Sequence, residues 1–493
     1  MSDWIDARRS AVLLHLTSLP GPGASGWLGH AARLFIRRMS EAGFSVWQFL
    51  PIGPTHEHGS PYESLSSFAG NPQYIDLFEL ARMGLLDEST IRPGMGHEEH
   101  HRCIIRAAAT FFSKKASHPE LFQSYETFLE NHRDWLDDFA LFTAIRACQR
   151  HKPWWQWPAT LRKRDQKDLR RFARDHEEDL RLVCFEQFVF EHQWQKLKHY
   201  AAEQRVLLFG DLPIYVAHDS ADVWANPELF TLKDDGQCEH VAGVPPDYFS
   251  KTGQRWGNPL YRWDRLERQD FDWWIRRIAH QMARMDLLRI DHFRGLAAYW
   301  AIPAERQDGV EGTWHKAPGD RLLAALQKRL GRLPLIAEDL GLITKDVIAL
   351  RKKYGLPGMK ILQFAFDGNP ENPYLPEHHE PDAVAYTGTH DNDTTLGWFR
   401  KLDEDTRQRV LKHLHCKDEE MPWPLIEAAL SSPALLSVIP MQDLLELGSE
   451  ARFNTPGTLH GNWTWRLGNI PEASAACWLR AAELNRRHGR QLS

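Results

Sequence analysis

Acidic residues follow several short apolar runs of this chain, near the point where each run ends. Asp211, Asp291, Glu338 and Asp391 all occupy such positions. A single aspartate there is often a helix cap or a turn former. Several acids after successive strands are harder to explain by capping, because the carboxyl ends of parallel barrel strands meet at one rim. The pattern therefore indicates an active site built from carboxylates.

Cleavage of a glycosidic bond is the chemistry that needs such a set of acids. One carboxylic acid protonates the leaving oxygen, and a carboxylate opposite it traps the oxocarbenium-like centre. Asp291 has the short side chain suited to a fixed nucleophile, whereas Glu338 can reach the leaving oxygen. Arg289, two residues before Asp291, points to the same face of a strand and should keep that carboxylate ionised. Glu338 must start protonated, so we expect its pKa to be raised.

Two other functions fit parts of this pattern. Asp291, His292, His390, Asp391 and Asp393 could hold a divalent metal in a barrel hydrolase, and inhibition by chelators would identify that class. A carbohydrate-binding protein without catalysis is a further hypothesis, but the intact set of acids argues against it.

Metal-ligating side chains also gather at His97, His100, His101 and Cys103. No second cluster at metal-ligand spacing accompanies them, and zinc sites typically pair their ligands. We therefore expect a polar surface turn here and no metal site.

The elements that would position the acids are short runs rich in β-branched or aromatic residues. They span residues 11–16, 44–50, 206–209, 287–290, 333–337, 359–366, 383–386 and 435–439. The runs are apolar throughout rather than alternating, as in a parallel sheet covered by helices. Helical stretches fill the gaps, for example at 273–285, 320–329 and 344–354. This order predicts an α/β fold, a (β/α)8 TIM barrel.

Two insertions interrupt the barrel pattern, which otherwise predicts one catalytic domain over residues 1–493. Residues 53–204, after the second strand, are rich in helix formers and should form a mainly helical subdomain. Residues 217–271, after the third strand, are rich in Pro, Gly and aromatic residues, and we expect a loop region with an active-site lid. Residues 448–493 hold a loop and a last helix, too little for a separate C-terminal domain.

The overall composition excludes several partners. The net charge of −6 offers no cationic surface for nucleic acid or for an anionic membrane. No apolar run reaches membrane-spanning length. The six cysteines lie far apart, and the start of the chain lacks the apolar core of a signal peptide. We therefore expect a cytoplasmic protein.

A series of short motifs runs through essentially the whole chain. It comprises Leu13-Leu14-His15 with Thr17-Ser18-Leu19-Pro20, Ser60-Pro61-Tyr62-Glu63-Ser64, Gly210-Asp211-Leu212-Pro213, Gly253-Gln254-Arg255-Trp256-Gly257-Asn258-Pro259, Arg289-Ile290-Asp291-His292, Ala337-Glu338-Asp339-Leu340-Gly341, Thr389-His390-Asp391-Asn392-Asp393-Thr394, and Asn454-Thr455-Pro456-Gly457 followed by Gly461-Asn462-Trp463. The strand-end motifs resemble the α-amylase superfamily. The full series, in this order, resembles the amylomaltases (4-α-glucanotransferases, glycoside hydrolase family 77).

The resemblance implies roles for particular residues. Asp291 would be the nucleophile, Glu338 the acid/base, and Asp391 the third essential carboxylate, which stabilises the transition state with His390. The other substrate-binding residues that it implies are Tyr62, Asp211, Gln254, Trp256, Arg289, His292 and Asn462. Gln254 and Trp256 would belong to a mobile lid loop within residues 244–261.

The reaction implied by the resemblance is disproportionation, without a metal or an organic cofactor. An α-1,4 bond of a maltooligosaccharide, or of a starch- or glycogen-like chain, is cleaved, and the donor half passes to another glucan or to glucose. Transfer exceeds hydrolysis only if the covalent intermediate is kept from water, which a lid could do. A retaining α-glucan hydrolase is the alternative within the same superfamily.

Two stretches depart from the pattern of the family. Trp27 stands where an aspartate is usual, and His56-Glu57-His58-Gly59 replaces a stretch that often contains tyrosine. We therefore expect an accessory aromatic contact to long glucans to be missing.

Overall fold

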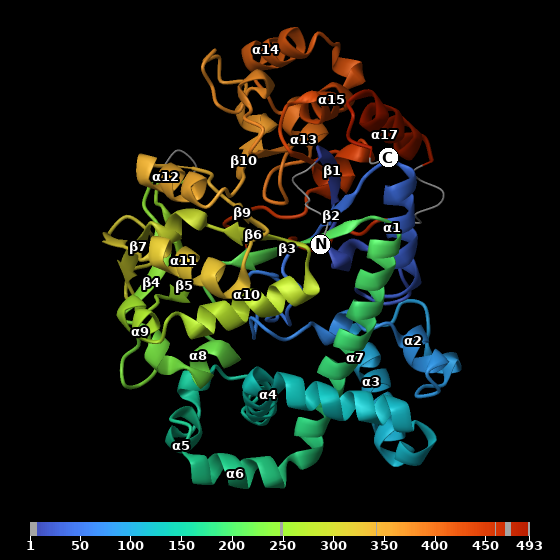
Figure 1. Ribbon diagram of the computed structural model, residues 1–493, viewed down its shortest axis with the longest axis vertical. Helices are drawn as coiled ribbons and strands as arrows, with labels where there is room; N and C mark the ends of the chain where they lie inside the picture. The colour runs from blue at the N-terminus through green and yellow to red at the C-terminus, as the bar shows by residue number, and fades with distance from the viewer. Residues whose placement is uncertain (1–6, 247–249, 342, 459, 469–474, 492–493) are drawn as a thin grey trace.

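Parallel strands close into a barrel near the middle of the molecule (Figure 1). The computed structural model describes residues 7–246, 250–341, 343–458, 460–468 and 475–491. Each barrel strand pairs with the next in the following list, and the last pairs with the first: β1 (Arg9–Leu13), β2 (Val46–Gln48), β3 (Leu207–Pro213), β6 (Leu287–Asp291), β9 (Leu335–Ala337), β10 (Gly358–Ile361), β11 (Ala383–Tyr386) and β12 (Leu436–Pro440). The predicted (β/α)8 barrel is confirmed.

The barrel strands are buried on both faces. Leu13 of β1 and Tyr386 of β11 belong to a core cluster inside the barrel. Their strand neighbours Val12 and Ala385 belong instead to the larger cluster between the barrel and the helices. Successive strand residues point to opposite sides, so burial of both sides explains why the predicted runs are apolar throughout.

Each of the eight predicted runs overlaps a barrel strand, and the first and the sixth run extend three residues or more beyond its end. After β1 the chain turns into the 3-10 helix η1 (Leu16–Ser18), and after β10 into the 3-10 helix η8 (Leu362–Phe364). Leu16 and Leu362 in these turns are buried like the strand residues, so hydrophobicity did not mark where the strands end.

Helices lie between and after the barrel strands. They are α1 (His30–Glu41), α10 (Asp272–Arg284), α11 (Gly319–Leu330), α12 (Lys345–Lys353), α13 (Thr395–Arg400), α14 (Glu404–Leu414), α15 (Trp423–Ser431), α16 (Met441–Leu444) and α17 (Ala475–Arg487). The three helices predicted at 273–285, 320–329 and 344–354 correspond to α10, α11 and α12. α17 packs against α1, α15 and α16, so this last helix belongs to the layer of helices around the barrel.

The long segment between β2 and β3 is mainly helical. Its helices are α2 (Leu77–Arg82), α3 (His97–Ser113), α4 (Pro119–Cys148), α5 (Ala159–Arg162), α6 (Gln166–Asp175) and α7 (Glu177–Glu203). α4 packs against α7, and α7 returns the chain to the barrel, as Figure 1 shows.

The polar surface turn predicted at residues 97–103 is wrong, because helix α3 begins at His97. His100 and Cys103 face the core rather than solvent. The His100 ring bonds to the Ile75 carbonyl through Nε2 (2.8 Å) and lies 5.2 Å from the Trp27 ring. Helical periodicity thus turns part of this polar cluster inward, where Trp27 packs on it.

A small antiparallel sheet lies beside the barrel and was not predicted. Its order is β5 (Gln254–Pro259), β4 (His240–Val244), β7 (Ala298–Pro303) and β8 (Thr313–Lys316). The segment 217–271 also forms helices α8 (Ala221–Ala225) and α9 (Trp263–Arg268), so a loop region is an incomplete description of it.

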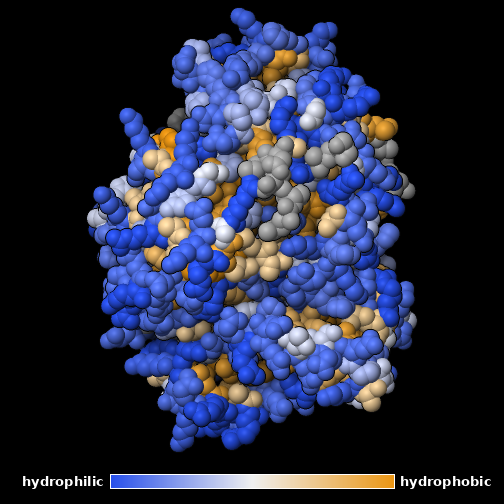
Figure 2. All heavy atoms as spheres, in the orientation of Figure 1, coloured by the Kyte–Doolittle hydropathy of each residue, from blue (hydrophilic) through white to orange (hydrophobic). Residues whose placement is uncertain are grey.

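Figure 2 shows a largely hydrophilic surface, with hydrophobic atoms visible mainly in recesses. Among the described residues, no helix is both long and apolar enough to cross a membrane.

Candidate active site

Arg289 joins two acids at the ends of neighbouring strands. The register of β3 and β6 places Asp211 opposite Arg289. The guanidinium donates through Nη1 to Asp211 Oδ2 (2.6 Å) and through Nη2 to Asp291 Oδ1 (2.7 Å). Burial would lower the pKa of Arg289, but the two carboxylates hold it well above its usual range. A fixed positive charge therefore lies between Asp211 and Asp291.

Tyr62 extends this network from the loop after β2. Its hydroxyl donates to Asp211 Oδ2 (2.6 Å), and its ring stacks on His390 with centroids 5.3 Å apart. His390 Nε2 lies 2.9 Å from the same phenol oxygen. Because the phenol proton is used by Asp211, His390 must donate to Tyr62 through a protonated Nε2. The network therefore requires a proton on Nε2 of His390.

Asp391 lies in the loop after β11, and its side chain is 44% exposed. Its Oδ2 is 3.3 Å from His390 Nε2, and its Oδ1 accepts a hydrogen bond from Asn454 Nδ2 (2.5 Å). Arg452 Nη2 donates to the main-chain oxygen of Asp391 (2.5 Å). Partial burial raises the pKa of Asp391, but His390 and Asn454 together bring it well below its usual range. Asp391 is therefore held as a carboxylate.

Glu338 directly follows β9 and binds main-chain amides instead. Its Oε2 accepts from His292 N (2.7 Å), and its Oε1 accepts from Leu340 N (2.9 Å). Burial, the largest effect, raises the pKa of Glu338 to about 7, and the charge of Asp291 adds to the rise. Arg289 and the two amides oppose it. The raised pKa expected for this residue is confirmed.

Gln254 and Trp256 approach this network from the small sheet. Both lie on strand β5, paired with β4, so the prediction of a loop at these two residues is wrong. The Trp256 ring meets His292 edge-on at 4.7 Å and donates through Nε1 to Gln254 Oε1 (3.0 Å). His292 is partly buried, and burial lowers its pKa to about 4. It is therefore neutral at pH 7.

Asn462 is the candidate residue that the structure does not bring to the carboxylates. Its amide is engaged within its own loop, where Oδ1 accepts from Thr455 N (2.9 Å) and Nδ2 donates to the Thr458 carbonyl (2.9 Å). Its neighbour Trp463 lies closer to the network, 6.2 Å from Tyr62 and 6.2 Å from His390 between ring centroids.

Asn454, Arg452 and Trp463 were not assigned roles from the sequence. Asn454 and Trp463 lie within the family motifs that begin at Asn454 and Gly461, so these motifs could have marked the two residues as candidates for the site. Arg452 donates to the main-chain oxygens of Asp391 and Asn454, and such contacts to the main chain are not visible in a residue pattern.

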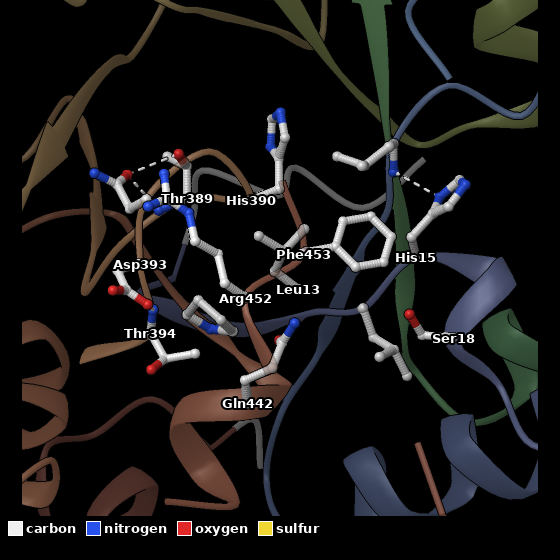
Figure 3. Close-up of a pocket in the computed structure, with 14 residues that line it drawn as sticks. Leu13, His15, Ser18, Thr389, His390, Asp393, Thr394, Gln442, Arg452 and Phe453 are labelled. Carbon is white, nitrogen blue, oxygen red and sulfur yellow. Dashed lines mark hydrogen bonds between the residues drawn. The ribbon is translucent and has the colours of Figure 1, made fainter. Parts of the chain in front are cut away.

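Two hollows flank the Tyr62–His390 pair. Figure 3 shows the first, of about 430 Å³, with His390 and Arg452 on one side and His15, next to the Phe453 ring, on the other. The second, of about 460 Å³, is lined by Tyr62 and Asp211 together with Arg277 of α10. The network of charged and aromatic groups therefore forms the wall between two indentations at the carboxyl ends of the strands.

The metal alternative predicts that histidine and acid side chains converge as ligands. Within the described residues, no three His, Cys, Asp or Glu side chains are grouped so that they could hold a metal ion. His390 instead uses Nε2 for Tyr62 and Asp391, and Asp393 bonds to Ser449 and Lys401.

The barrel and the carboxylates at its rim define an α/β-barrel enzyme of the kind that acts on glycosidic bonds. The model of glycoside hydrolase family 77, described as 4-alpha-glucanotransferase, matches residues 14–471. The chain therefore belongs to the 4-alpha-glucanotransferase family.

Relatives and solved structures agree with this membership. The chain is 48% identical to the 4-alpha-glucanotransferase of Thermus thermophilus, over 93% of this chain and 95% of the relative. It is 44% identical to that of Synechocystis sp., over 94% of each. The structure of the amylomaltase from Streptococcus agalactiae in complex with acarbose matches with a TM-score of 0.94 and 34% identity, and the match covers 98% of this chain and 100% of that one.

Proposed function

We propose that this enzyme transfers α-1,4-glucan segments between maltooligosaccharides, or from a glucan to glucose, by double displacement with retention. Asp291 is the nucleophile: Arg289 holds its Oδ1, which leaves Oδ2 to attack the anomeric carbon. Glu338 gives its proton to the glycosidic oxygen as the bond from that oxygen to the anomeric carbon breaks. The products of this half are a covalent glycosyl-enzyme and a shortened glucan.

The second half reverses these steps with a new partner. The 4-hydroxyl of an acceptor glucan, or of glucose, loses its proton to Glu338 as its oxygen displaces Asp291 from the anomeric carbon. The bond that forms is again α-1,4, and both acids return to their starting states. The Asp391 carboxylate, held in place by His390, stabilises the positive charge that develops on the sugar in both halves.

The opposite states of two acids in one site carry this proposal. A pKa of about 7 lets Glu338 both give and take a proton near neutral pH, whereas Asp391 stays ionised far into the acid range. The names of the relatives and the acarbose complex of the S. agalactiae enzyme support an α-glucan substrate. The wide spacing of the cysteines supports a reducing, cytoplasmic location.

Incubation with maltotriose tests the proposal. The wild-type enzyme should give a ladder of longer chains plus glucose, with little net increase in reducing ends. Asp291→Asn and Glu338→Gln should each lower turnover by about 10³-fold or more while glucan binding persists. Asp76→Asn, which alters the buried cap of helix α2, is the control for general damage. Normal turnover in either active-site variant would contradict the assignments, and glucose with maltose alone would indicate a hydrolase.

A further inference from the structure

A buried carboxylate lies behind the Asp391 loop. Asp443 is in α16, directly after β12, and is 1% exposed. Among the described residues, no cation forms an ion pair with it, and Asp393 is near enough to raise its pKa further. Fully buried, unpaired aspartates are rare because desolvation is costly. Its hydrogen bonds must therefore compensate for that cost.

These hydrogen bonds hold the two ends of one segment, residues 387–395. Asp443 Oδ2 accepts from Thr387 Oγ1 (2.6 Å) and from Thr395 Oγ1 (2.7 Å), and Oδ1 accepts from Thr395 N (2.7 Å). Thr387 is the residue after β11, and Thr395 is the first residue of α13. The segment between them, 388–394, carries His390 and Asp391.

The interior of the segment depends on those ends. Asn392 Oδ1 accepts from both the amide (2.9 Å) and the hydroxyl (2.8 Å) of Thr389, so His390 and Asp391 lie within a tight turn. The Asp393 carbonyl accepts from Gln363 (2.9 Å). The contacts of Asp443 with Thr387 and Thr395 fix the two ends of this turn relative to β12.

We infer that Asp443 is a positioning residue, which holds the 387–395 segment so that His390 and Asp391 meet the sugar during transfer. This inference rests on the proposed function, because it concerns the alignment of those two side chains. Asp443 itself does not touch the substrate. It acts through the two threonines, and a small displacement of aligned groups is enough to lower a rate strongly.

Asp443→Asn tests the inference without a change in volume. Asparagine keeps one acceptor oxygen but turns an NH₂ donor toward two hydroxyl donors. We expect kcat to fall about 30-fold, with hydrogen exchange in peptide 387–395 about tenfold faster. Asp76→Asn, a buried cap distant from this segment in sequence, should change neither. Exchange like that of the wild type, or faster exchange with wild-type kcat, would overturn the inference.

A second pair of variants keeps the test decisive if Asp443→Asn does not fold. Thr387→Val removes one donor but preserves shape, and we expect kcat to fall about fivefold. Thr387→Ser restores the hydroxyl and should recover most of that loss. Equal activity of Val and Ser at this position would refute the inference. Failure of the proposed function would look different from failure of this inference. In the first case Asp391→Asn would be active, while hydrogen exchange would still show whether Asp443 holds the segment.

Discussion

Glu338 and Asp391 are carboxyl groups that follow strands of the same barrel, but their surroundings differ. Glu338 binds two neutral main-chain amides and has Asp291 nearby, whereas Asp391 binds an imidazole and the Asn454 amide. The pKa of the first rises to about 7, and that of the second falls well below its usual range. Desolvation favours the neutral acid at both sites, so the nearby charges and donors decide the outcome.

The largest expected effect is on kcat, and the leaving group of the donor distinguishes the role of Glu338 from that of Asp391. Glu338→Gln should lower kcat on maltotriose by about 10³-fold, because the glycosidic oxygen then leaves unprotonated. With α-maltosyl fluoride, whose leaving group needs no proton, the burst of one equivalent of fluoride should slow only about tenfold, because this first half does not need Glu338 as a base. Pre-steady-state measurements with both donors give the difference.

Asp391→Asn is the matched variant for this comparison. It should lower the rate by about 10³-fold with both donors, because stabilisation of the sugar does not depend on the leaving group. Rescue of this variant by the fluoride donor would remove the distinction between the two acids.

The low pKa of Asp391 should depend on Asn454. Asn454→Ala removes the donor to Asp391 Oδ1, and loss of a hydrogen bond to a charged group should lower kcat/KM about 30-fold. The same change raises the pKa of Asp391, so the acidic limb of the pH profile should move to higher pH. Asn462→Ala, in the same loop, should leave that limb in place, and a shift there would show that the limb does not report on Asp391.

The basic limb should report on Glu338. The first half of the reaction needs its protonated form, so kcat/KM of the wild type should fall about tenfold per pH unit above pH 7. Rates between pH 5 and pH 9 measure this limb. Glu338→Gln should lack the limb, and its persistence in that variant would assign the titration to another group.

The smallest expected effect is on stability. Because folding raises the pKa of Glu338, the folded state loses stability as pH rises from about 4.5 to about 7. Glutamine does not ionise, so Glu338→Gln should gain stability relative to the wild type across that window, by on the order of 2 kcal/mol. Denaturant unfolding at pH 4.5 and pH 8 measures it. A constant difference between the two proteins would contradict the raised pKa.

The sequence predicted the barrel more completely than its surroundings. Continuous apolar runs mark strands that are buried on both faces, and all eight were found. The sheet of β4, β5, β7 and β8 was missed because its members are short and partly exposed; β8, for example, is exposed at every residue. The family resemblance had placed Gln254 and Trp256 in a lid loop, whereas both lie on β5.

The acids could be predicted, but most of their partners could not. Asp291 and Glu338 follow apolar runs, and this pattern can be read from the sequence alone. The amides of His292 and Leu340 that bind Glu338 belong to the main chain, and every residue type except proline supplies such a donor. The contact of Asn454 with Asp391 spans 63 residues and depends on how the last loop returns to the barrel.

The amide that binds Glu338 Oε2 belongs to His292, the residue directly after the proposed nucleophile Asp291. The peptide unit that joins Asp291 to His292 is planar, so the direction of this N–H is fixed relative to the main chain of Asp291. His292 itself has a left-handed conformation, with φ of 54°, and turns the chain away directly after that unit. A shift of the main chain at this point would therefore move the two acids together.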